Sequence, residues 1–228
     1  MSRNHVALGV ALALALPSLA LAQFVGVDFN TVNGATIQNW NVLTTAGSVP
    51  NLISDTGAPT GWSFAVTTAG GGFAFATDPN LATVPTHNYP LDGIDDYLTG
   101  SAGTTGAAQF SNLPANTPFN VFAFGLRGFT PLAMDWTVAG SNTITFNMNG
   151  GPQELWVNGE VGTSARTLSS YARTVTSSAT GTLDFTYDPI GNAPFAVAGI
   201  AIAVVPEPSA TSVLLGCAAV LLRRVRRR

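Results

Sequence analysis

The run FAVAGIAIAVV, residues 195–205, gives the strongest indication of fold class in this chain. It is apolar throughout, which is typical of a strand that is buried on both faces. A membrane helix is disfavoured, because the run holds a glycine and several β-branched residues. We therefore expect a β-strand here that is covered from both sides.

The body before this run reads as a series of short strands. No stretch keeps an apolar period of 3.6 residues for three turns, so we expect no helix there. Runs rich in aromatic and β-branched residues alternate with Gly, Pro and Asn, and they cover residues 24–30, 61–68, 71–77, 120–126 and 181–188. The stretch SNTITFNMNGGPQELWVNG, residues 141–159, predicts a hairpin with a strand through Met148, a turn at NGGP and a strand through Val157. This spacing, without helical crossovers, predicts an all-β fold, an antiparallel β-sandwich or jelly roll.

The chain begins with the features of a secretory signal peptide. A short basic head, MSRNH, precedes the apolar run VALGVALALAL and the segment PSLALA. Ala20 and Ala22 are the small residues that such signals place before the cut, here before Gln23. An N-terminal membrane anchor is the alternative, but eleven apolar residues are far fewer than the ~20 that span a bilayer. We expect a cleaved signal helix at residues 1–22 and one folded body at residues 23–205.

The last residues, 206–228, have three parts in order. Pro206, Glu207 and Pro208 form a stiff joint that is not helical. Residues 209–222 then carry no charge and would form a short transmembrane helix of about 21 Å, against ~30 Å of hydrocarbon. The chain closes with a cluster of arginines that orient the tail toward the cytoplasm and leave the body outside: Arg223, Arg224, Arg226, Arg227 and Arg228.

This tail resembles the PEP-CTERM sorting signal, on the motif Val205-Pro206-Glu207-Pro208 followed by a short apolar helix and terminal arginines. The resemblance implies a bacterial protein that is exported through the inner membrane by the secretion translocon. It further implies transient anchoring in that membrane and cutting near the motif by an exosortase. Such proteins accompany exopolysaccharide and biofilm production, and the processed body would reach the cell surface or the extracellular matrix. A plain C-terminal tail anchor is the alternative.

The body is also similar, more weakly, to the β-sandwich ectodomains that precede this kind of tail. The similarity rests on the opening VDFN, the middle stretch FSNLPANTPFNVFAFG and the closing VAGIAIAVVPEP. Related patterns occur in galactose-binding-like sandwiches. The similarity implies the same fold and leaves ligand binding open.

Charge excludes one class of partner. Residues 23–205 hold eleven acidic groups and three arginines, a net charge of −8, and the chain has no lysine. Nucleic-acid binding needs clustered cations, so we expect no nucleic-acid partner. Anionic polysaccharide is also disfavoured unless a divalent cation bridges the two. The one cysteine, Cys217, lies in the tail, so the body has no disulfide and no cysteine metal site.

Catalytic residues are scarce, and we expect no enzyme. His87 is the one histidine after the signal peptide, it lies in the loop TVPTHNYP, and the chain has no Gly-x-Ser-x-Gly elbow. A glycosidase would need two carboxylates about 5–10 Å apart, and the acidic groups stand mostly near turns.

Two patterns offer binding sites. Asp92, Asp95 and Asp96, in LDGIDDY, form the densest acidic cluster and could ligate a structural calcium, although their spacing is not that of an EF-hand. A solvated turn is the favoured alternative. Trp40, in QNWNVL, is the best candidate for an exposed sugar platform, with core packing favoured over it.

Other residues are interpreted as structural. Trp62 and Trp156 follow strand alternation and are predicted to pack in the core, while Tyr89 and Tyr97 stand beside the acidic cluster. Arg127, between glycines in an apolar setting, is predicted to pair with an aspartate.

Three functions stay open at this point. The first is a non-enzymatic surface or matrix protein that associates with exopolysaccharide in a biofilm. The second is a carbohydrate-binding module with a defined sugar site, and the third is a secreted glycan-active enzyme.

Overall fold

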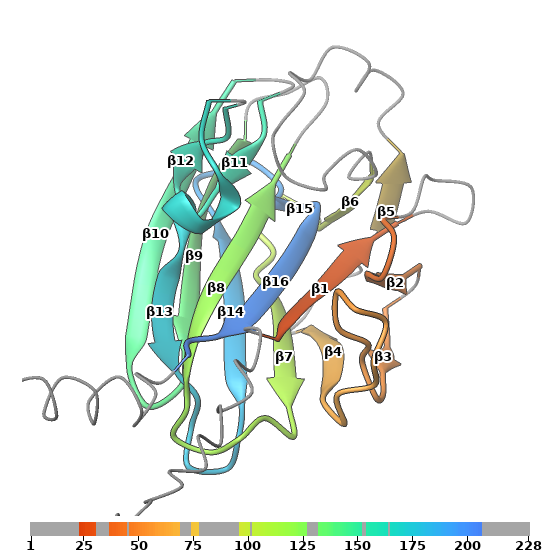
Figure 1. Cartoon of the computed structure of the whole chain (residues 1–228). Helices are drawn as coiled ribbons and strands as arrows, with labels where there is room; N and C mark the ends of the chain where they lie inside the picture. Colours follow the sequence, from red (N-terminus) through yellow and green to blue (C-terminus); the bar gives the residue numbers. More distant parts are fainter. Residues whose placement is uncertain are drawn as a thin grey trace, which may run out of the picture. The chain divides into compact units, whose positions relative to one another are not determined.

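The fold is a sandwich of β-sheets. The computed structural model describes residues 23–30, 37–44, 46–68, 74–77, 96–100, 102–126, 132–151, 154–163 and 165–206. The strands lie in one compact unit, Ala22–Val205, and form two large sheets and one small sheet (Figure 1). The one helical turn among the described residues is a short 3₁₀ helix, Leu168–Tyr171. The all-β prediction is confirmed.

The first large sheet, sheet A, has seven strands in the order β12-β11-β8-β16-β1-β2, with β13 also paired to β8. Their bounds are β1 Phe24–Phe29, β2 Asn41–Leu43, β8 Pro118–Gly125, β11 Trp156–Val157, β12 Glu160–Val161, β13 Arg173–Thr176 and β16 Gly199–Val204. The pairs are antiparallel except β1–β2, which is parallel. This one parallel pair departs from the purely antiparallel sheet that the sequence predicts.

The second large sheet, sheet B, has six antiparallel strands in the order β10-β9-β14-β7-β4-β3. Their bounds are β3 Ser48–Val49, β4 Ser63–Thr68, β7 Gly106–Ser111, β9 Leu132–Ala139, β10 Thr143–Gly150 and β14 Leu183–Pro189. Buried and more exposed residues alternate along β7, β9 and β14. Sheet B therefore has one face on the core and one polar face toward solvent.

The run at residues 195–205 forms two strands. Ala196–Val197 is β15, which joins β5 (Ala74–Thr77) and β6 (Asp96–Thr99) in the small sheet. Gly199–Val204 is β16, which lies between β8 and β1 in sheet A (Figure 1). Every residue from Ala196 to Ala203 is buried, so the prediction of a strand covered on both faces is confirmed.

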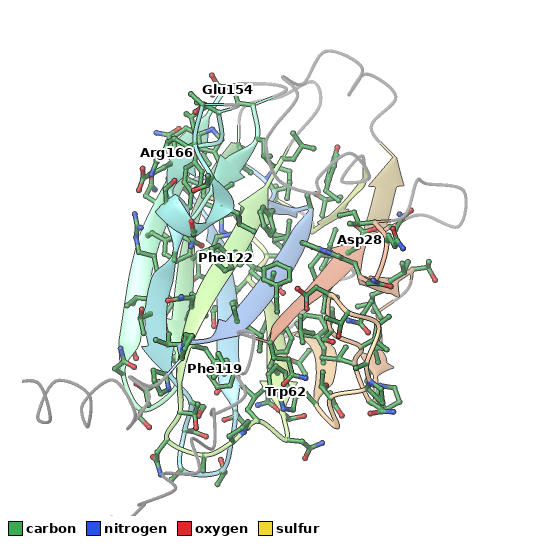
Figure 2. All side chains as sticks on the ribbon, in the orientation of Figure 1. Asp28, Trp62, Phe119, Phe122, Glu154 and Arg166 are labelled. Carbon is green, nitrogen blue, oxygen red and sulfur yellow. The ribbon has the colours of Figure 1, made fainter. Side chains whose placement is uncertain are left out.

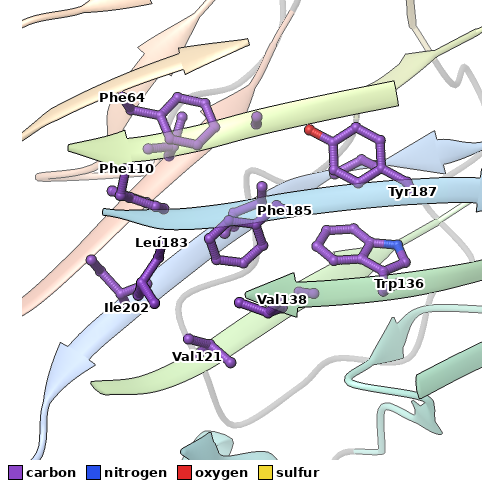
Figure 3. Packing of buried hydrophobic residues seen from close by; sticks show 14 of the residues in the cluster. Phe64, Phe110, Val121, Trp136, Val138, Leu183, Phe185, Tyr187 and Ile202 are labelled. Atoms are coloured by element: carbon purple, nitrogen blue, oxygen red, sulfur yellow. The ribbon is translucent and has the colours of Figure 1, made fainter. Parts of the chain in front are cut away.

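The main core fills the space between the two large sheets (Figure 3). Trp136 and Tyr187 of sheet B lie there with ring centroids 5.0 Å apart, and both are fully buried. Phe29 of β1 meets Phe64 of β4 with ring centroids 5.9 Å apart, which joins the sheets directly. Burial of this apolar surface supplies the main driving force for folding, at about 25 cal/mol per Å².

A second apolar cluster covers the outer face of sheet A. It joins outward side chains of β8 and β16 to residues of two loops: Ile37, Trp40, Phe122, Phe124, Leu126, Leu155, Val157, Tyr171, Ala198, Ala201 and Ala203. Because loops cover this face, the central strands β1, β8 and β16 of sheet A are buried on both sides along most of their length.

The predicted hairpin at residues 141–159 is wrong. β10 forms its hairpin with the preceding strand β9, through eight residue pairs and a tight turn in which the Gly140 amide donates to the Asn142 carbonyl at 2.9 Å. Trp156 and Val157 belong instead to β11 of sheet A, where they pair with β8. The chain therefore passes from sheet B to sheet A between the end of β10 at Gly150 and the start of β11 at Trp156.

The predicted signal helix and transmembrane helix fall on residues 1–22 and 207–228, which lie outside the described residues. Within the described part of the chain, no helix is long and apolar enough to cross a membrane.

Candidate functional site

A groove opens on the outer side of sheet A, where the two loops of the second cluster approach each other. Its volume is about 510 Å³, and its lining comprises Phe24, Ile37, Gln38, Asn39, Trp40, Asp55 and Leu168. Small-ligand sites typically measure about 300–1,000 Å³ and combine an apolar lining with a few polar groups. Both conditions are met here.

The floor of the groove is aromatic. The indole of Trp40 lies against Gly26 of β1, so closely that a Cβ atom on Gly26 would overlap it. Its ring centroid stands 5.8 Å from that of Phe24 and 5.8 Å from that of Phe124. Phe122 lies beside Phe24, with ring centroids 6.0 Å apart, on the outer face of β8 (Figure 2).

Trp40 is 5% exposed, so the packing alternative is the one that the structure supports. It is not an open platform for a sugar ring. It does line the groove, and it gives the groove a rigid apolar base.

Asn41 attaches the loop at residues 51–55 to sheet A. Its side-chain amide donates to the carbonyls of Gly26 and Ile53, both at 2.9 Å, and its Oδ1 accepts from the Ile53 amide at 2.8 Å. Asn41 is itself buried. Three hydrogen bonds from one buried side chain therefore fix the position of this loop.

The next residues place a carboxylate at the rim. The Gly57 amide donates to the Ser54 carbonyl at 2.8 Å, which closes a turn with Asp55 inside it. Asn39 has a positive φ of 61°, which asparagine adopts more easily than most residues, and its side chain donates to the Asp55 carbonyl at 2.7 Å. The Asp55 amide donates to Phe24 at 2.9 Å. The backbone of Asp55 is thus held on both sides.

The opposite wall carries Leu168, which begins the 3₁₀ helix. This segment is tied to sheet A by Asn158, whose side chain donates to Val121 at 2.6 Å and to Tyr171 at 2.8 Å and accepts from the Ala123 amide at 2.8 Å. The hydroxyl of Tyr171 donates to the Val161 carbonyl at 3.1 Å. The wall is therefore anchored at its far end.

An ion-pair cluster supports the same wall from outside. Glu160 accepts hydrogen bonds from Arg166 and Arg173, and the guanidinium of Arg166 lies 3.9 Å from the centre of the Tyr171 ring (Figure 2). The hydrogen bond from Arg166, followed by that from Arg173, lowers the pKa of Glu160 below its ordinary 4.5. About a third of each of these side chains is exposed, so solvent screens the attraction.

The groove presents Gln38 and Asp55 as exposed polar side chains next to aromatic and aliphatic groups. Such a lining suits a ligand with apolar ring faces and hydroxyl groups at its edges. Among the described residues that line the groove, Asp55 is the one acidic residue.

The other predicted aromatic residues lie elsewhere. Trp62 is in the core, where its ring meets Phe119 edge to face at 5.5 Å (Figure 2), and this prediction is confirmed. Trp156 is half-buried against the core, and its indole N–H donates to Glu154 at 3.3 Å. Tyr97 is half-buried against both clusters.

The side chains of the predicted calcium site lie outside the described residues. Asp96 begins β6, but its side chain lies outside the described residues, as do Asp92 and Asp95. The same holds for His87, Tyr89 and Arg127. In the described residues, no group of three His, Cys, Asp or Glu side chains could hold a metal ion.

Sequence reasoning identified Trp40 and missed the other six residues of the lining, which are Phe24, Ile37, Gln38, Asn39, Asp55 and Leu168. Phe24 lies in a predicted strand, Leu168 begins the 3₁₀ helix, and the others stand in loops. Asparagines at positive φ precede or follow two of these loops, but such residues mark many turns of this chain. No local signal in the sequence joins residues so far apart.

Comparison with known proteins adds a set of distant structural likenesses. No family model and no curated protein sequence matches the chain. Carbohydrate-binding modules are among the solved structures that it resembles. One is the CBM35 module of Abf62 from Cellvibrio japonicus, with 9% identity and a TM-score of 0.31 over 61% of this chain and 91% of the module.

Two longer structures also match. The CBM22-1–GH10 modules of Clostridium thermocellum xylanase 10B, complexed with xylohexaose, show 9% identity and a TM-score of 0.37 over 63% of this chain. The Bacillus subtilis protein YXIM shows 11% identity and a TM-score of 0.42 over 80% of this chain. The matched parts span 26% and 40% of those two chains. At these identities and scores, the likeness says nothing of ligand or activity.

Proposed function

We propose that the body, residues 23–205, is a non-catalytic carbohydrate-binding β-sandwich whose groove on sheet A holds a glycan. The observation that carries the proposal is the lining itself: a packed aromatic floor of Trp40 and Phe24 beside the exposed polar side chains of Gln38 and Asp55. A pyranose ring offers the matching chemistry, with apolar faces and hydroxyl groups around them.

The test is a glycan array, with the producer's own exopolysaccharide added, in calcium and in chelator. Leu168→Trp fills the groove from its wall, and Asn149→Trp places the same indole on the exposed edge strand β10 as a matched control. We expect saturable binding that Leu168→Trp abolishes and Asn149→Trp preserves. Equal binding by both variants, or no binding by the wild-type protein, would contradict the proposal.

We further propose that this body is exported, held briefly in the inner membrane by its tail and released near Pro206 by an exosortase. What supports this proposal is how the body ends. The Val204 amide donates to the Gln23 carbonyl at 3.2 Å, and the Val205 amide donates to Pro118 at 3.0 Å. The first and last strands of the body thus pair with each other, and a cut at Pro206 would remove no strand of the sandwich.

Processing is tested by mass spectrometry of the surface-exposed protein. The proposal expects an N-terminus at Gln23 and a C-terminus near the Val205–Pro208 motif, where Glu207→Ala should leave the tail uncut. Recovery of the full tail on the exported wild-type protein would contradict it.

A further inference from the structure

We infer that the groove selects its glycan by charge, taking an amino-sugar polymer in preference to a neutral one and a neutral one in preference to a uronic-acid polymer. The inference rests on the proposed function, and it assigns Asp55 as the residue that sets the preference. The ligand group that Asp55 would meet is the ammonium of a hexosamine without its N-acetyl group.

The backbone of Asp55 is fixed while its carboxylate stays unused. Its amide donates to Phe24 at 2.9 Å and its carbonyl accepts from Asn39 at 2.7 Å. Its side chain is exposed, lines the groove, and makes neither an ion pair nor a hydrogen bond with the residues that the structure describes. A carboxylate so placed can bond to a ligand without giving up a partner.

No described cation competes for this carboxylate or offers itself to an anionic ligand. Of the three arginines in the body, the structure describes Arg166 and Arg173, and both donate to Glu160. Neither lines the groove. A uronic acid bound here would place its carboxylate near Asp55 without a compensating positive group, whereas an amino sugar brings that group itself.

Substitution of Gln38 distinguishes general binding of sugar hydroxyl groups from the charge preference set by Asp55. Its exposed amide can donate to and accept from hydroxyl groups, which all hexose polymers share. Loss of this side chain should weaken every bound glycan to a similar degree. Loss of the Asp55 charge should change only the difference between charged and neutral glycans.

The size of the preference follows from Coulomb's law. Two unit charges about 4 Å apart attract by about 1 kcal/mol in a medium like bulk water, which corresponds to about fivefold in affinity. The site is open to solvent, so this water-like value applies. Salt should weaken the preference, because the Debye length falls from about 10 Å at 0.1 M to about 3 Å at 1 M.

The experiment is calorimetric titration of the body, residues 23–205, with a glucosamine hexamer, its N-acetylated counterpart and a hexagalacturonate, at pH 6 and low salt. We expect the glucosamine hexamer to bind about fivefold more tightly than the acetylated one, and the hexagalacturonate about fivefold more weakly than the acetylated one. Asp55→Asn should remove the difference. Asp184→Asn, on the solvent face of β14, changes the net charge equally and should preserve it.

Each result bears on one of the two proposals. Equal affinity for the two hexamers, no binding of either, or the same effect from Asp184→Asn as from Asp55→Asn would overturn the inference. Binding of other neutral glycans, blocked by Leu168→Trp, would still leave the proposed function standing. Absence of binding to every glycan would overturn both.

Discussion

Tyr187 gives the sharpest test of the core. Its ring is fully buried on β14 between Trp136 and Phe195, with ring centroids 5.0 and 5.3 Å away. Its hydroxyl has no hydrogen-bond partner in the described structure. Burial raises the pKa of the Tyr187 phenol far above its ordinary 10.0, so the group stays neutral. Removing this oxygen by Tyr187→Phe should stabilise the protein.

The magnitude is the difference of two terms. A buried polar group without a partner costs about 1–3 kcal/mol. The void left by one oxygen, roughly 15 Å³, costs about 0.4 kcal/mol at about 24 cal/mol per Å³. The net expectation is a gain of about 0.6–2.6 kcal/mol in the free energy of unfolding. For a body of this length that is a rise of about 1–10 °C in Tm.

Urea denaturation followed by tryptophan fluorescence measures the gain, with Tyr171→Phe as the matched control. The hydroxyl of Tyr171 accepts from the Thr163 amide at 3.0 Å and donates to the Val161 carbonyl at 3.1 Å. Its removal should cost about 1–2 kcal/mol. If Tyr187→Phe destabilises the protein as Tyr171→Phe does, the reasoning from an unpartnered hydroxyl is refuted.

Three further substitutions probe the groove and its supports. Glu160→Gln should reduce the loss of stability in acid, because a lowered carboxyl pKa adds stability above about pH 4.5 that is lost as the pH falls through the pKa of the folded state. Urea midpoints measured between pH 7 and pH 3 would show the reduction. An unchanged dependence of the midpoint on pH would contradict it. Asn41→Ala should cost about 3 kcal/mol in urea denaturation, at about 1 kcal/mol for each of its three hydrogen bonds, and a loss under 1 kcal/mol would be inconsistent with them. Gly26→Ala should displace the Trp40 indole, cost about 1–3 kcal/mol and abolish glycan binding in titration, whereas unchanged affinity would show that the floor plays no part.

The sequence predicts burial of the run 195–205 on both faces, because this prediction does not depend on which strands pair with the run. The run 195–205 has no polar residue to present to water, so any fold must cover it. The run is divided between two sheets at Ala198, and no residue pattern in the sequence indicates this division. By contrast, strand β9 is absent from the sequence-based prediction, although its side chains alternate toward the core at Leu132, Met134, Trp136 and Val138.

That omission explains the wrong hairpin. Because no strand is predicted immediately before β10, the prediction pairs β10 with the next apolar segment, through a turn at the glycines of NGGP. In the structure β10 forms eight pairs with β9, whereas β11 contributes two residues to sheet A. Pairing β10 with β9 forms more backbone hydrogen bonds than pairing it with the two-residue strand β11 could form. It also closes a shorter loop, which costs less conformational entropy.

The groove was beyond sequence reasoning for a different reason. Its residues come from positions 24, 37–40, 55 and 168, and nothing local says that these segments meet. Trp40 was noticed because tryptophan is rare and its neighbours are asparagines. Its burial depends on Gly26, whose missing side chain leaves room for the indole on β1. A close approach of this kind is set by tertiary packing and not by either neighbourhood alone.

Substitutions in the groove should differ in whether they change the free energy of unfolding as well as glycan binding. Trp40 belongs to the cluster that covers sheet A, so its removal would open a cavity and cost both fold and ligand. Gln38 and Asp55 stand at the rim with exposed side chains, and their substitution should alter affinity with little effect on unfolding. A glycan at 100 times its Kd should raise the free energy of unfolding of the wild-type protein by about 2.7 kcal/mol. Because rim variants start from the same unliganded stability, the thermal shift each retains would report the contribution of that side chain to binding alone.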